Sequence, residues 1–366
     1  MTKQLKILCG AGGTGGHLFP AVAVIEQIEK LYDGDVEVHF AGRSDKIEGE
    51  KVPLLGYKFH PVKIRGVRKL TTLSNLMIPF EIRSSVAKMR KLIRSEKFDF
   101  VLCTGSYISF PPGRAAQREG VPLFLMESNV NPGKSINMLS KGAAAIFTSF
   151  SDSQKFFPVS YHNKIFYLGN PVRQSLFSLP EKSDAKAKFD YDPEQKLIFI
   201  FGGSLGAGSI NNAVEKNLDL IAKSDYKLLW QTGKNYTPQN DLPRNIIQTK
   251  FIDDMASAYA AADLVISRSG ATTVAELAVI AKPSILVPLE TASNNEQSLN
   301  AQIFEKNGAA KVLKNKELVK NLFSLAEQLL KNNELLTQMS VNAEKLANKN
   351  AAKNTAIKIL NLINLK

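Results

Sequence analysis

The sequence predicts an α/β protein of two Rossmann-like, doubly wound domains facing each other across a cleft. Two glycine-rich loops of similar design, about two hundred residues apart, are the first observation. Gly10–His17 follows the largely apolar run Leu5–Cys9, and Gly202–Gly206 follows the apolar run Leu197–Phe201. Each loop joins a buried-strand signature to a helical pattern. The second observation is the length of 366 residues, which suits two domains.

The first half of the chain alternates apolar runs with helical patterns such as Pro20–Tyr32 and Ile82–Ser95. This βαβ rhythm predicts a parallel sheet. The expected strands are residues 5–9, 36–41, 99–103, 122–126, 144–148 and 165–168.

A break in this rhythm predicts the domain boundary. Gly169–Arg173 interrupts the alternation, and the polar stretch Ser178–Glu194 follows. Strands are then expected near 197–201, 227–231, 246–249, 263–267 and 284–287. The last helical pattern, ending at 356–363, is expected to cross back to the first domain. We therefore predict one domain of residues 1–169 plus about 348–366, and a second of residues 170–347.

Composition is typical of a folded protein, with 44% hydrophobic and 22% charged residues. No run of eighteen apolar residues predicts a spanning helix. Gly10–Gly16 would interrupt the apolar region of a signal peptide, so none is expected. Cys9 and Cys103 each end a strand-like run and are expected as small core residues without a disulfide, which fits a reducing cytoplasm.

The net charge of +13 is unevenly distributed. Between Pro61 and Lys97, ten basic residues face two acidic ones and surround the apolar Leu76–Phe80. Such a segment fits a surface that meets anionic lipid, although composition alone favours a core helix with a solvated basic face. A nucleic-acid surface is a third alternative, which the lack of interleaved aromatic residues disfavours.

The first glycine loop allows two interpretations. Gly10-x-Gly12-x-x-Gly15 matches the dinucleotide fingerprint, but the next strand ends at Gly42-Arg43 instead of a ribose-binding acid. Arg43 keeps an NADP interpretation open, because it could accept a 2′-phosphate. His17 starts a helix, whose dipole favours a neutral imidazole that can take a proton. Alternatively, His17 only caps the turn.

The segment from Asp263 to Glu276 is the strongest local signal. Ser269–Thr273 supplies amides and hydroxyls at a helix start, which suits a pyrophosphate. Glu276 can accept both hydroxyls of a ribose, or it is only an acid stabilised by the helix dipole. Phe251–Met255 follows another strand and can offer backbone groups to a base.

Metal binding is not expected. Asp190-Tyr-Asp192 has the spacing of metal-dependent sugar transferases, but it precedes the strand at 197, whereas α/β ligands bind at carboxyl ends. His39, His60 and His162 have no partners at ligand spacing and are expected as ordinary surface or core residues.

Together, Gly12–His17, Gly169–Arg173, Gly202–Ser204, Phe251–Met255 and Arg268–Glu276 occur in an order that resembles the MurG-type N-acetylglucosaminyltransferases of glycosyltransferase family 28, which have the GT-B fold. The resemblance covers essentially the whole chain. It implies inverting transfer of N-acetylglucosamine from UDP-N-acetylglucosamine to the muramyl 4-hydroxyl of undecaprenyl-linked lipid I, giving lipid II and UDP. It also implies a peripheral enzyme on the cytoplasmic face of the inner membrane, acting in cell-wall synthesis and hence in cell shape and division.

By this resemblance the second domain binds the donor, through the Ile252 backbone to uracil, Glu276 to ribose and Gln297 to the sugar. Ser204, Arg173 and the loop 271–273 are expected near the phosphates. The first domain receives lipid I, with His17 assisting deprotonation. The expected binding residues are Thr14, Gly15, Gly16, Asn129, Arg173, Ser204, Ile252, Ala271, Thr272, Thr273, Val274, Ala275, Glu276 and Gln297. The lipid interpretation of the basic segment now becomes the preferred one, with a membrane face of Arg65, Arg68, Lys69, Leu76, Met77, Ile78 and Phe80. Neither a cofactor nor a protein-held metal is implied.

The chain departs from the family pattern at four places. Leu205 replaces a glutamine, Met126–Asn129 replaces His-Glu-Gln-Asn, Thr104–Pro112 has fewer glycines, and Glu296 precedes Gln297 where glutamine or histidine is usual. Competing interpretations are a UDP-N-acetylglucosamine 2-epimerase, an NADP-dependent reductase, and a non-catalytic basic protein that binds lipid or nucleotide.

Overall fold

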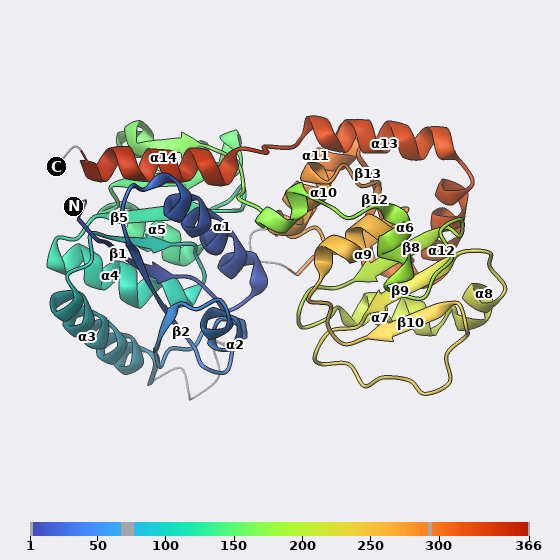
Figure 1. Ribbon diagram of the computed structural model, residues 1–366, viewed down its shortest axis with the longest axis horizontal. Coiled ribbons are helices and arrows are strands. Elements are labelled where there is room, and N and C mark those ends of the chain that lie inside the picture. Colours follow the sequence, from blue (N-terminus) through green and yellow to red (C-terminus); the bar gives the residue numbers. More distant parts are fainter. Residues whose placement is uncertain (1–2, 67–76, 292–294, 365–366) are drawn as a thin grey trace. The chain divides into compact units, whose positions relative to one another are not determined.

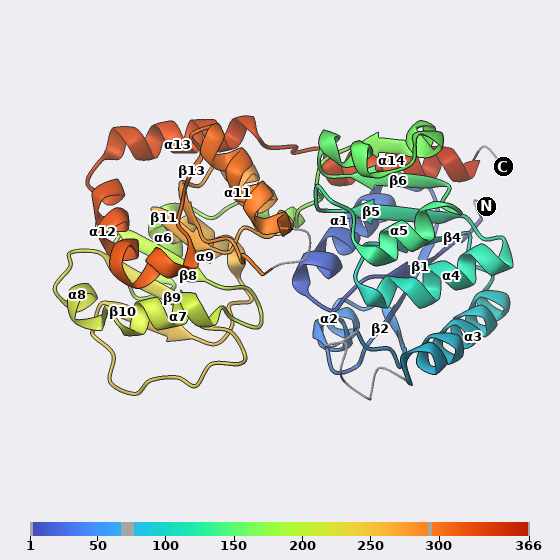
Figure 2. The same ribbon diagram turned by 180° about the vertical axis from the view of Figure 1, so that it is seen from behind.

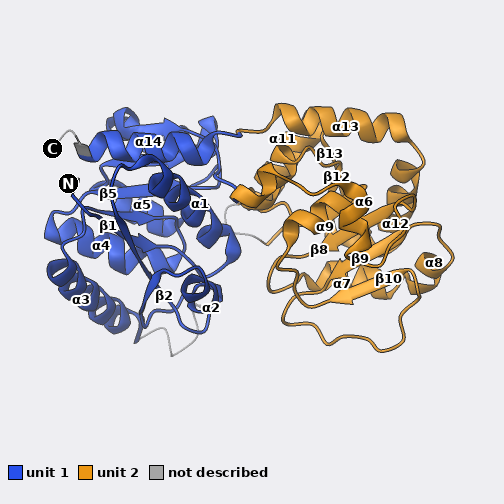
Figure 3. Ribbon diagram, in the orientation of Figure 1, with its two compact units in different colours: residues 1–173, 349–366 blue, residues 174–348 orange. Residues whose placement is uncertain are grey.

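A computed structural model describes residues 3–66, 77–291 and 295–364. The chain divides into two compact units, one running to Arg173 and resuming at Lys349, the other spanning Gln174–Asn348 (Figure 3). Each unit is built around its own parallel sheet. The C-terminal segment therefore belongs to the same unit as the N-terminus.

The sheet of the first unit has the order β3-β2-β1-β4-β5-β6-β7 among the described residues (Figure 1). Its strands are β1 (Leu5–Gly10), β2 (Val36–Gly42), β3 (Lys58–Pro61), β4 (Phe100–Cys103), β5 (Leu123–Glu127), β6 (Ala145–Thr148) and β7 (Ile165–Tyr167). The helices are α1 (Gly15–Leu31), α2 (Ile47–Leu54), α3 (Ile78–Glu96), α4 (Phe110–Glu119), α5 (Lys134–Ser140) and α14 (Ala351–Asn364). The strand order reverses between β1 and β4, and a ligand crevice forms outside the carboxyl ends at such a reversal.

The second unit repeats this plan with the order β10-β9-β8-β11-β12-β13 (Figure 2). Its strands are β8 (Leu197–Phe201), β9 (Lys227–Gln231), β10 (Ile246–Thr249), β11 (Leu264–Ser267), β12 (Ser284–Leu286) and β13 (Ala310–Val312). Its helices are α6 (Lys182–Ala187), α7 (Gly208–Glu215), α8 (Leu218–Ala222), α9 (Met255–Ala261), α10 (Ala271–Val279), α11 (Glu296–Lys306), α12 (Leu318–Leu330) and α13 (Asn333–Lys345). Here the reversal lies between β8 and β11.

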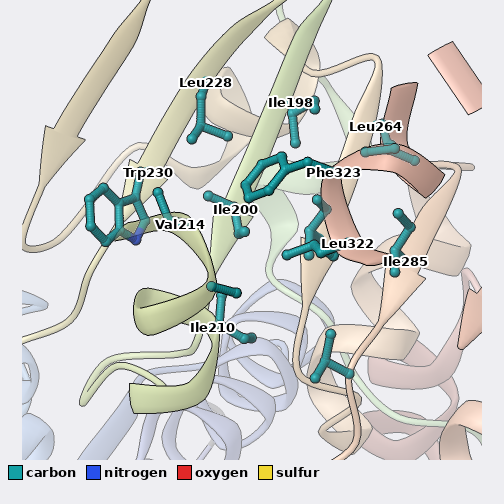
Figure 4. Close-up of a cluster of buried hydrophobic side chains, with 14 of the residues drawn as sticks. Ile198, Ile200, Ile210, Val214, Leu228, Trp230, Leu264, Ile285, Leu322 and Phe323 are labelled. Carbon is teal, nitrogen blue, oxygen red and sulfur yellow. The ribbon is translucent and has the colours of Figure 1, made fainter. Parts of the chain in front are cut away.

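The core of the second unit shows why these strands form (Figure 4). Alternate residues of β8, Ile198 and Ile200, are fully buried in one cluster with Trp230 of β9. Phe323 of α12 packs in the same cluster. Because the strands are buried on both faces, they read as continuous apolar runs, as in other parallel sheets. Trp230 Nε1 donates to Asn211 Oδ1 at 3.1 Å, so the buried indole keeps a polar partner.

Helix α14 completes the core of the first unit. Ile359 is fully buried in the same cluster as Leu18 and Ile25 of α1, and α14 lies beside α1 in both views (Figures 1 and 2). Alanine, isoleucine and leucine recur at helical spacing along α14, which gives it an apolar face. The return of the last helix to the first domain, expected from the sequence, is thus part of the observed fold.

The structure confirms the two-domain α/β class and adds elements that the sequence did not predict. The short edge strands β3 and β13 were missed, and α1 begins at Gly15 instead of Pro20. Cys9 and Cys103 are free and buried, as expected. In the described part of the chain, no helix is long and apolar enough to cross a bilayer.

Candidate active site

In the first unit, the loop after β1 leads directly into α1 at the point where the strand order reverses. Gly12 and Gly13 have φ values of +153° and +87°, a backbone region that L side chains rarely adopt. Thr14 is the N-cap residue, and Gly15 and Gly16 form the first turn of α1. His17 follows them on this turn. The predicted loop residues thus gather at the crevice edge of the sheet.

His17 is held in one tautomer by the residue that follows β4. Its Nδ1 donates to the Thr104 carbonyl at 2.8 Å, and Thr104 Oγ1 donates to the His17 carbonyl at 2.7 Å. In the neutral imidazole, Nε2 then carries the lone pair. Burial lowers the pKa of His17, and the hydrogen bond to Thr104 only partly offsets this effect. The arrangement therefore gives a neutral imidazole with a proton-accepting Nε2.

A glycine packs against this imidazole and leads to a prediction. Gly105 has φ +97°, and a Cβ there would lie 3.2 Å from His17 Cε1. Gly105→Ala should lower transfer about ten- to hundred-fold, because small displacements of a reacting group are costly. Gly56→Ala is the matched control, since its φ is +82° but nothing lies within 4 Å of its Cβ. Rates and melting temperatures of both variants test this, and equal rates for the two would contradict it.

A buried carboxylate that sequence analysis missed holds the first loop. Glu48 of α2 is fully buried, and its two oxygens accept the backbone N–H of Gly13 at 2.8 Å and of Arg43 at 2.9 Å. A Cβ at Gly12 or Gly42 would lie 2.4 Å from the Glu48 side chain. Glu48 thus fastens the loop to the end of β2, and both neighbouring glycines are needed for its fit.

Two further groups at this edge bear on the alternatives. The Arg43 guanidinium donates to Asp45 Oδ1 at 2.7 Å and to the Ile64 carbonyl at 2.8 Å, so the group considered for a 2′-phosphate is already engaged. Asn129 follows β5 at the same carboxyl edge as His17. Its N–H donates to Glu127 Oε1 at 2.8 Å, which fixes the loop that carries its amide side chain.

In the second unit, the loop between β8 and α7 brings backbone close to backbone. A Cβ at Gly206 would lie 2.2 Å from the Thr232 carbonyl oxygen, and one at Gly233 would lie 2.0 Å from the Gly206 nitrogen. This packing fixes the loop, with Ser204 half-buried within it. Leu205, the departure noted above, is 49% exposed and contributes no polar group.

The helix start after β11 lies beside this loop in the sheet order. Gly270 is the N-cap of α10 and has no side chain that could cap the helix, whose first-turn amides have no partner within the helix itself. Ala271 and Val274 are buried, whereas Thr272, Thr273 and Ala275 are half-buried. Such a helix start binds phosphate through its amides and its dipole.

Arg268 and Gln297 form hydrogen bonds next to this helix start. The half-buried Arg268 guanidinium donates to Asn315 Oδ1 at 2.9 Å and to Ser209 Oγ at 2.8 Å. Burial lowers its pKa. Gln297 of α11 is brought to the same place, since its carbonyl accepts Ser269 Oγ at 2.8 Å. Its side-chain Oε1 accepts the Leu289 N–H at 3.0 Å.

The predicted nucleoside residues have buried partners that the sequence did not reveal. Glu276 is 3% exposed, and its Oε2 accepts the hydroxyl of Tyr259 at 2.9 Å. The Ile252 N–H donates to Gln231 Oε1 at 2.9 Å, so this backbone donor is already engaged within the protein. Gln231 ends β9, and a polar residue at the carboxyl end of a parallel strand is the signal that could have found it.

Arg173 is the last residue of the first unit, and its guanidinium lies 4.4 Å from the centroid of the Phe19 ring on α1. Ser204 and Glu276 belong to the second unit. Arg173 therefore shares its unit with His17, although it was expected on the donor side.

The expected membrane face is only partly covered by the structure. Arg68, Lys69 and Leu76 lie outside the described residues. Met77 and Phe80 are 54% and 64% exposed at the start of α3, as a membrane face requires. Ile78, however, is 8% exposed and packs inward, so its inclusion was wrong. Arg65 is paired with Glu81, with 2.8 Å between its Nε and Oε1.

His39 and His60, expected as ordinary residues without partners at ligand spacing, do have side-chain partners in the structure. His39 Nε2 lies 3.0 Å from Glu37 Oε1, and His60 Nε2 lies 3.0 Å from His39 Nδ1. Within the described ranges, Glu37, His39 and Glu96 form a group close enough to hold a metal ion. Glu37 and His39 lie two residues apart on β2, whereas Glu96 ends α3 and comes near them only in the folded chain. Lysines already occupy the Glu37 carboxylate, with Lys6 Nζ at 3.0 Å.

This cluster predicts a pH effect on stability. Hydrogen bonds from Lys58, His39 and Lys6 lower the pKa of Glu37 from 4.5 to about 2. Its stabilising contribution is therefore fully present above 4.5 and is lost as the pH falls through about 2. Glu37→Gln should destabilise the protein near neutral pH, and the difference from wild type should shrink on acidification. Urea unfolding at several pH values, with exposed Glu305→Gln as control, tests this. A difference that does not change with pH would contradict it.

Two doubly wound units, one with a histidine beside its glycine loop and the other with a glycine-capped helix that carries a buried glutamate, have the two-domain architecture of the GT-B glycosyltransferases. The family profiles agree. The glycosyltransferase family 28 N-terminal domain matches residues 7–148, and its C-terminal domain matches residues 197–355. The chain belongs to glycosyltransferase family 28, and the resemblance seen in its motifs is confirmed. It is therefore a hexosyltransferase by family.

Curated relatives match over their full length. The chain is 34% identical to a UDP-N-acetylglucosamine–N-acetylmuramyl-(pentapeptide) pyrophosphoryl-undecaprenol N-acetylglucosamine transferase from Christiangramia forsetii, covering all of both chains. It is 36% identical to the enzyme of the same name from Bacteroides thetaiotaomicron, covering 99% of each.

Solved structures match the fold as well. The MurG of Acinetobacter baumannii matches with a TM-score of 0.71 at 27% identity, covering 98% of this chain and all of the other. A UDP-N-acetylglucosamine 2-epimerase from Neisseria meningitidis matches with a TM-score of 0.68 at 15% identity, covering 98% and 100%. At that identity, the epimerase shares the fold alone.

Proposed function

We propose that this chain transfers N-acetylglucosamine from UDP-N-acetylglucosamine to the muramyl 4-hydroxyl of lipid I, with inversion, forming lipid II and UDP. The observation that carries the proposal is the start of α10, where the first-turn amides and the buried Glu276 carboxylate lie on one helix. This pairing matches a pyrophosphate joined to a ribose. The full-length relatives named for this reaction support the choice of sugar and acceptor.

On the donor side, each part of the nucleotide has a complementary group. The pyrophosphate would lie at the first-turn amides of residues 271–273, with the Ser204 hydroxyl as a further donor. Glu276 would accept the ribose hydroxyls. The Ile252 carbonyl would accept the N3–H of uracil, and Gln297 would contact the sugar. The groups proposed to bind the pyrophosphate are amide N–H groups and a hydroxyl of the protein. The proposed reaction therefore uses these donors and no protein-held metal.

On the acceptor side, His17 Nε2 would take the proton of the muramyl hydroxyl as its oxygen forms the new bond to the anomeric carbon. The bond from that carbon to the UDP oxygen breaks on the opposite face, and the electron pair leaves with UDP. The amides of α10 stabilise the charge that develops there. Asn129, at the same sheet edge as His17, is the proposed contact to the acceptor sugar.

The proposal is tested by radiolabel transfer. Label from UDP-[¹⁴C]-N-acetylglucosamine should appear on a lipid I analogue, with one UDP released per sugar transferred. Release of UDP-N-acetylmannosamine without any acceptor would instead identify an epimerase. If label neither moves to the acceptor nor epimerises, while UDP still binds, the chain is a non-catalytic nucleotide-binding protein and the proposal fails.

We also propose that the segment 61–97 docks on anionic membrane, because exposed Met77 and Phe80 adjoin its basic residues. Charge reversal of Arg65, Arg68 and Lys69 should weaken binding to vesicles containing phosphatidylglycerol at least about ten-fold, at about 1 kcal/mol per basic residue. Reversal of the exposed Lys223, Lys316 and Lys320 in the second unit is the control. Because Arg65 pairs with Glu81, the Arg68 and Lys69 reversal is also measured alone. Unchanged sedimentation with vesicles would refute the docking face.

A further inference from the structure

The Tyr259 side chain has a fixed position in the second unit. Tyr259 lies on α9 and is fully buried. Its ring meets the rings of Phe199 and Phe201 edge-on, with centroid separations of 5.7 and 6.0 Å. Both phenylalanines belong to β8, the strand that leads into the second glycine loop. The ring is therefore held against β8 in the edge-to-face geometry that aromatic pairs prefer.

The Tyr259 hydroxyl is directed at the Glu276 carboxylate. It donates to Glu276 Oε2 at 2.9 Å, and both side chains are almost completely removed from solvent. A buried carboxylate needs hydrogen-bond donors to offset its lost hydration. A bond to a rigid tyrosine also restricts the rotation of the carboxylate, which a mobile water would not do.

Helix α9 also connects this contact to the base-binding loop. The helix starts one residue after Asp254, whose Oδ1 accepts the Ser257 N–H at 3.0 Å and caps it. Ile252 lies just before this cap and is held by Gln231. Helix α9 thus carries Tyr259, which contacts the proposed ribose ligand Glu276. It begins three residues after Ile252, the proposed uracil ligand.

We propose that Tyr259 is a positioning residue for the nucleotide ribose. It orients Glu276 so that its carboxylate accepts hydroxyls of a ribonucleoside diphosphate, and it thereby sets the preference for ribose over deoxyribose. This inference rests on the proposed function, in which Glu276 binds the ribose of the donor. It adds a residue that does not itself touch the substrate.

The test uses Tyr259→Phe in the full-length protein, which keeps the ring and removes only the hydroxyl. Calorimetry measures the dissociation constants of UDP, 2′-deoxy-UDP and 3′-deoxy-UDP. Wild type should bind at least one deoxy nucleotide about ten-fold more weakly than UDP, since a hydrogen bond to a charged group is worth about 1.5–3 kcal/mol. In Tyr259→Phe, UDP binding should weaken about ten-fold and the difference between UDP and the deoxy nucleotide should largely disappear.

A matched control separates orientation from general destabilisation. Tyr191 is also buried in the second unit, and its hydroxyl donates to the Leu228 carbonyl at 2.9 Å. Tyr191→Phe should lower the melting temperature but keep the preference for UDP. In a Glu276→Ala background, Tyr259→Phe should cause no additional loss of UDP affinity, because the hydroxyl then has no carboxylate to orient.

The outcomes distinguish the two proposals. If wild type binds UDP and both deoxy nucleotides equally, the ribose role of Glu276 fails, and the proposal for Tyr259 fails with it. If wild type discriminates and Tyr259→Phe retains both its affinity and its discrimination, only the positioning role is overturned. A Tyr259→Phe protein that loses UDP affinity but keeps the full preference also overturns it, because uniform weakening indicates a merely structural role. A steady-state assay adds a check, since the variant should raise the KM for the donor and leave kcat near wild type.

Discussion

His17→Ala is expected to reduce sugar transfer by about 10²- to 10⁴-fold while leaving UDP affinity unchanged. The imidazole belongs to the first unit, whereas the proposed nucleotide ligands belong to the second. Steady-state transfer and calorimetric UDP titration are measured on the same preparation. His17→Asn is the sharper variant, because an amide N–H can replace the donor to the Thr104 carbonyl but cannot accept the proton. Transfer above about a tenth of wild type in both variants would exclude His17 as the base.

The same residue predicts the pH profile. Burial lowers the pKa of His17 below the ordinary value of 6.5, so the imidazole is neutral at neutral pH. Since only the neutral form accepts a proton, kcat/KM for the acceptor should be constant near neutral pH and fall only at pH values below 6.5. His17→Asn should lose this acid limb. An identical limb in the variant would assign it to another group.

The second large effect is expected for Glu276→Ala, which should weaken UDP binding about ten- to hundred-fold. Hydrogen bonds to a charged acceptor contribute about 1.5–3 kcal/mol each, and the ribose offers two hydroxyls. Glu327→Gln on α12 is the control, since that carboxylate pairs with Lys331 at the surface. UDP affinity is measured together with the free energy of unfolding, because the variant also leaves the buried Tyr259 hydroxyl without this acceptor. UDP affinity within about two-fold of wild type would contradict the ribose role.

The central strands were predictable because they are buried on both faces. Leu197–Phe201 is a continuous apolar run and Leu5–Cys9 is apolar except for Lys6. Both precede glycines, and both strands were found within a residue of their bounds. The edge strands β3 and β13 were missed for the opposite reason. They have four and three residues, are partly exposed, and show neither a continuous run nor a clear alternation. Helix α1 extends back through Gly15 and Gly16 because tertiary packing outweighs the weak helix propensity of glycine.

Candidate site residues could be predicted where they lie in the loop or helix that follows a predicted strand. The sequence points to His17, Glu276 and the start of α10 as candidates, because glycine loops and helix starts are visible in it. The residues that hold these candidates in position could not be predicted. Glu48 reaches Gly13 from 35 residues away, and Thr104 reaches His17 from 87 residues away. No local pattern encodes such contacts, since they exist only after the parallel sheet has aligned its carboxyl ends.

The position of α14 has a consequence for the synthesis of the chain. Ile359 and Leu360 bury against α1, so the first unit acquires part of its interior only after residues 174–348 have been made. During translation, apolar surface of α1 in the first unit stays exposed until the second unit and α14 have been synthesised. The first unit is therefore begun first and completed last. Translation that stops before α14 leaves the hydrophobic core of the first unit incomplete.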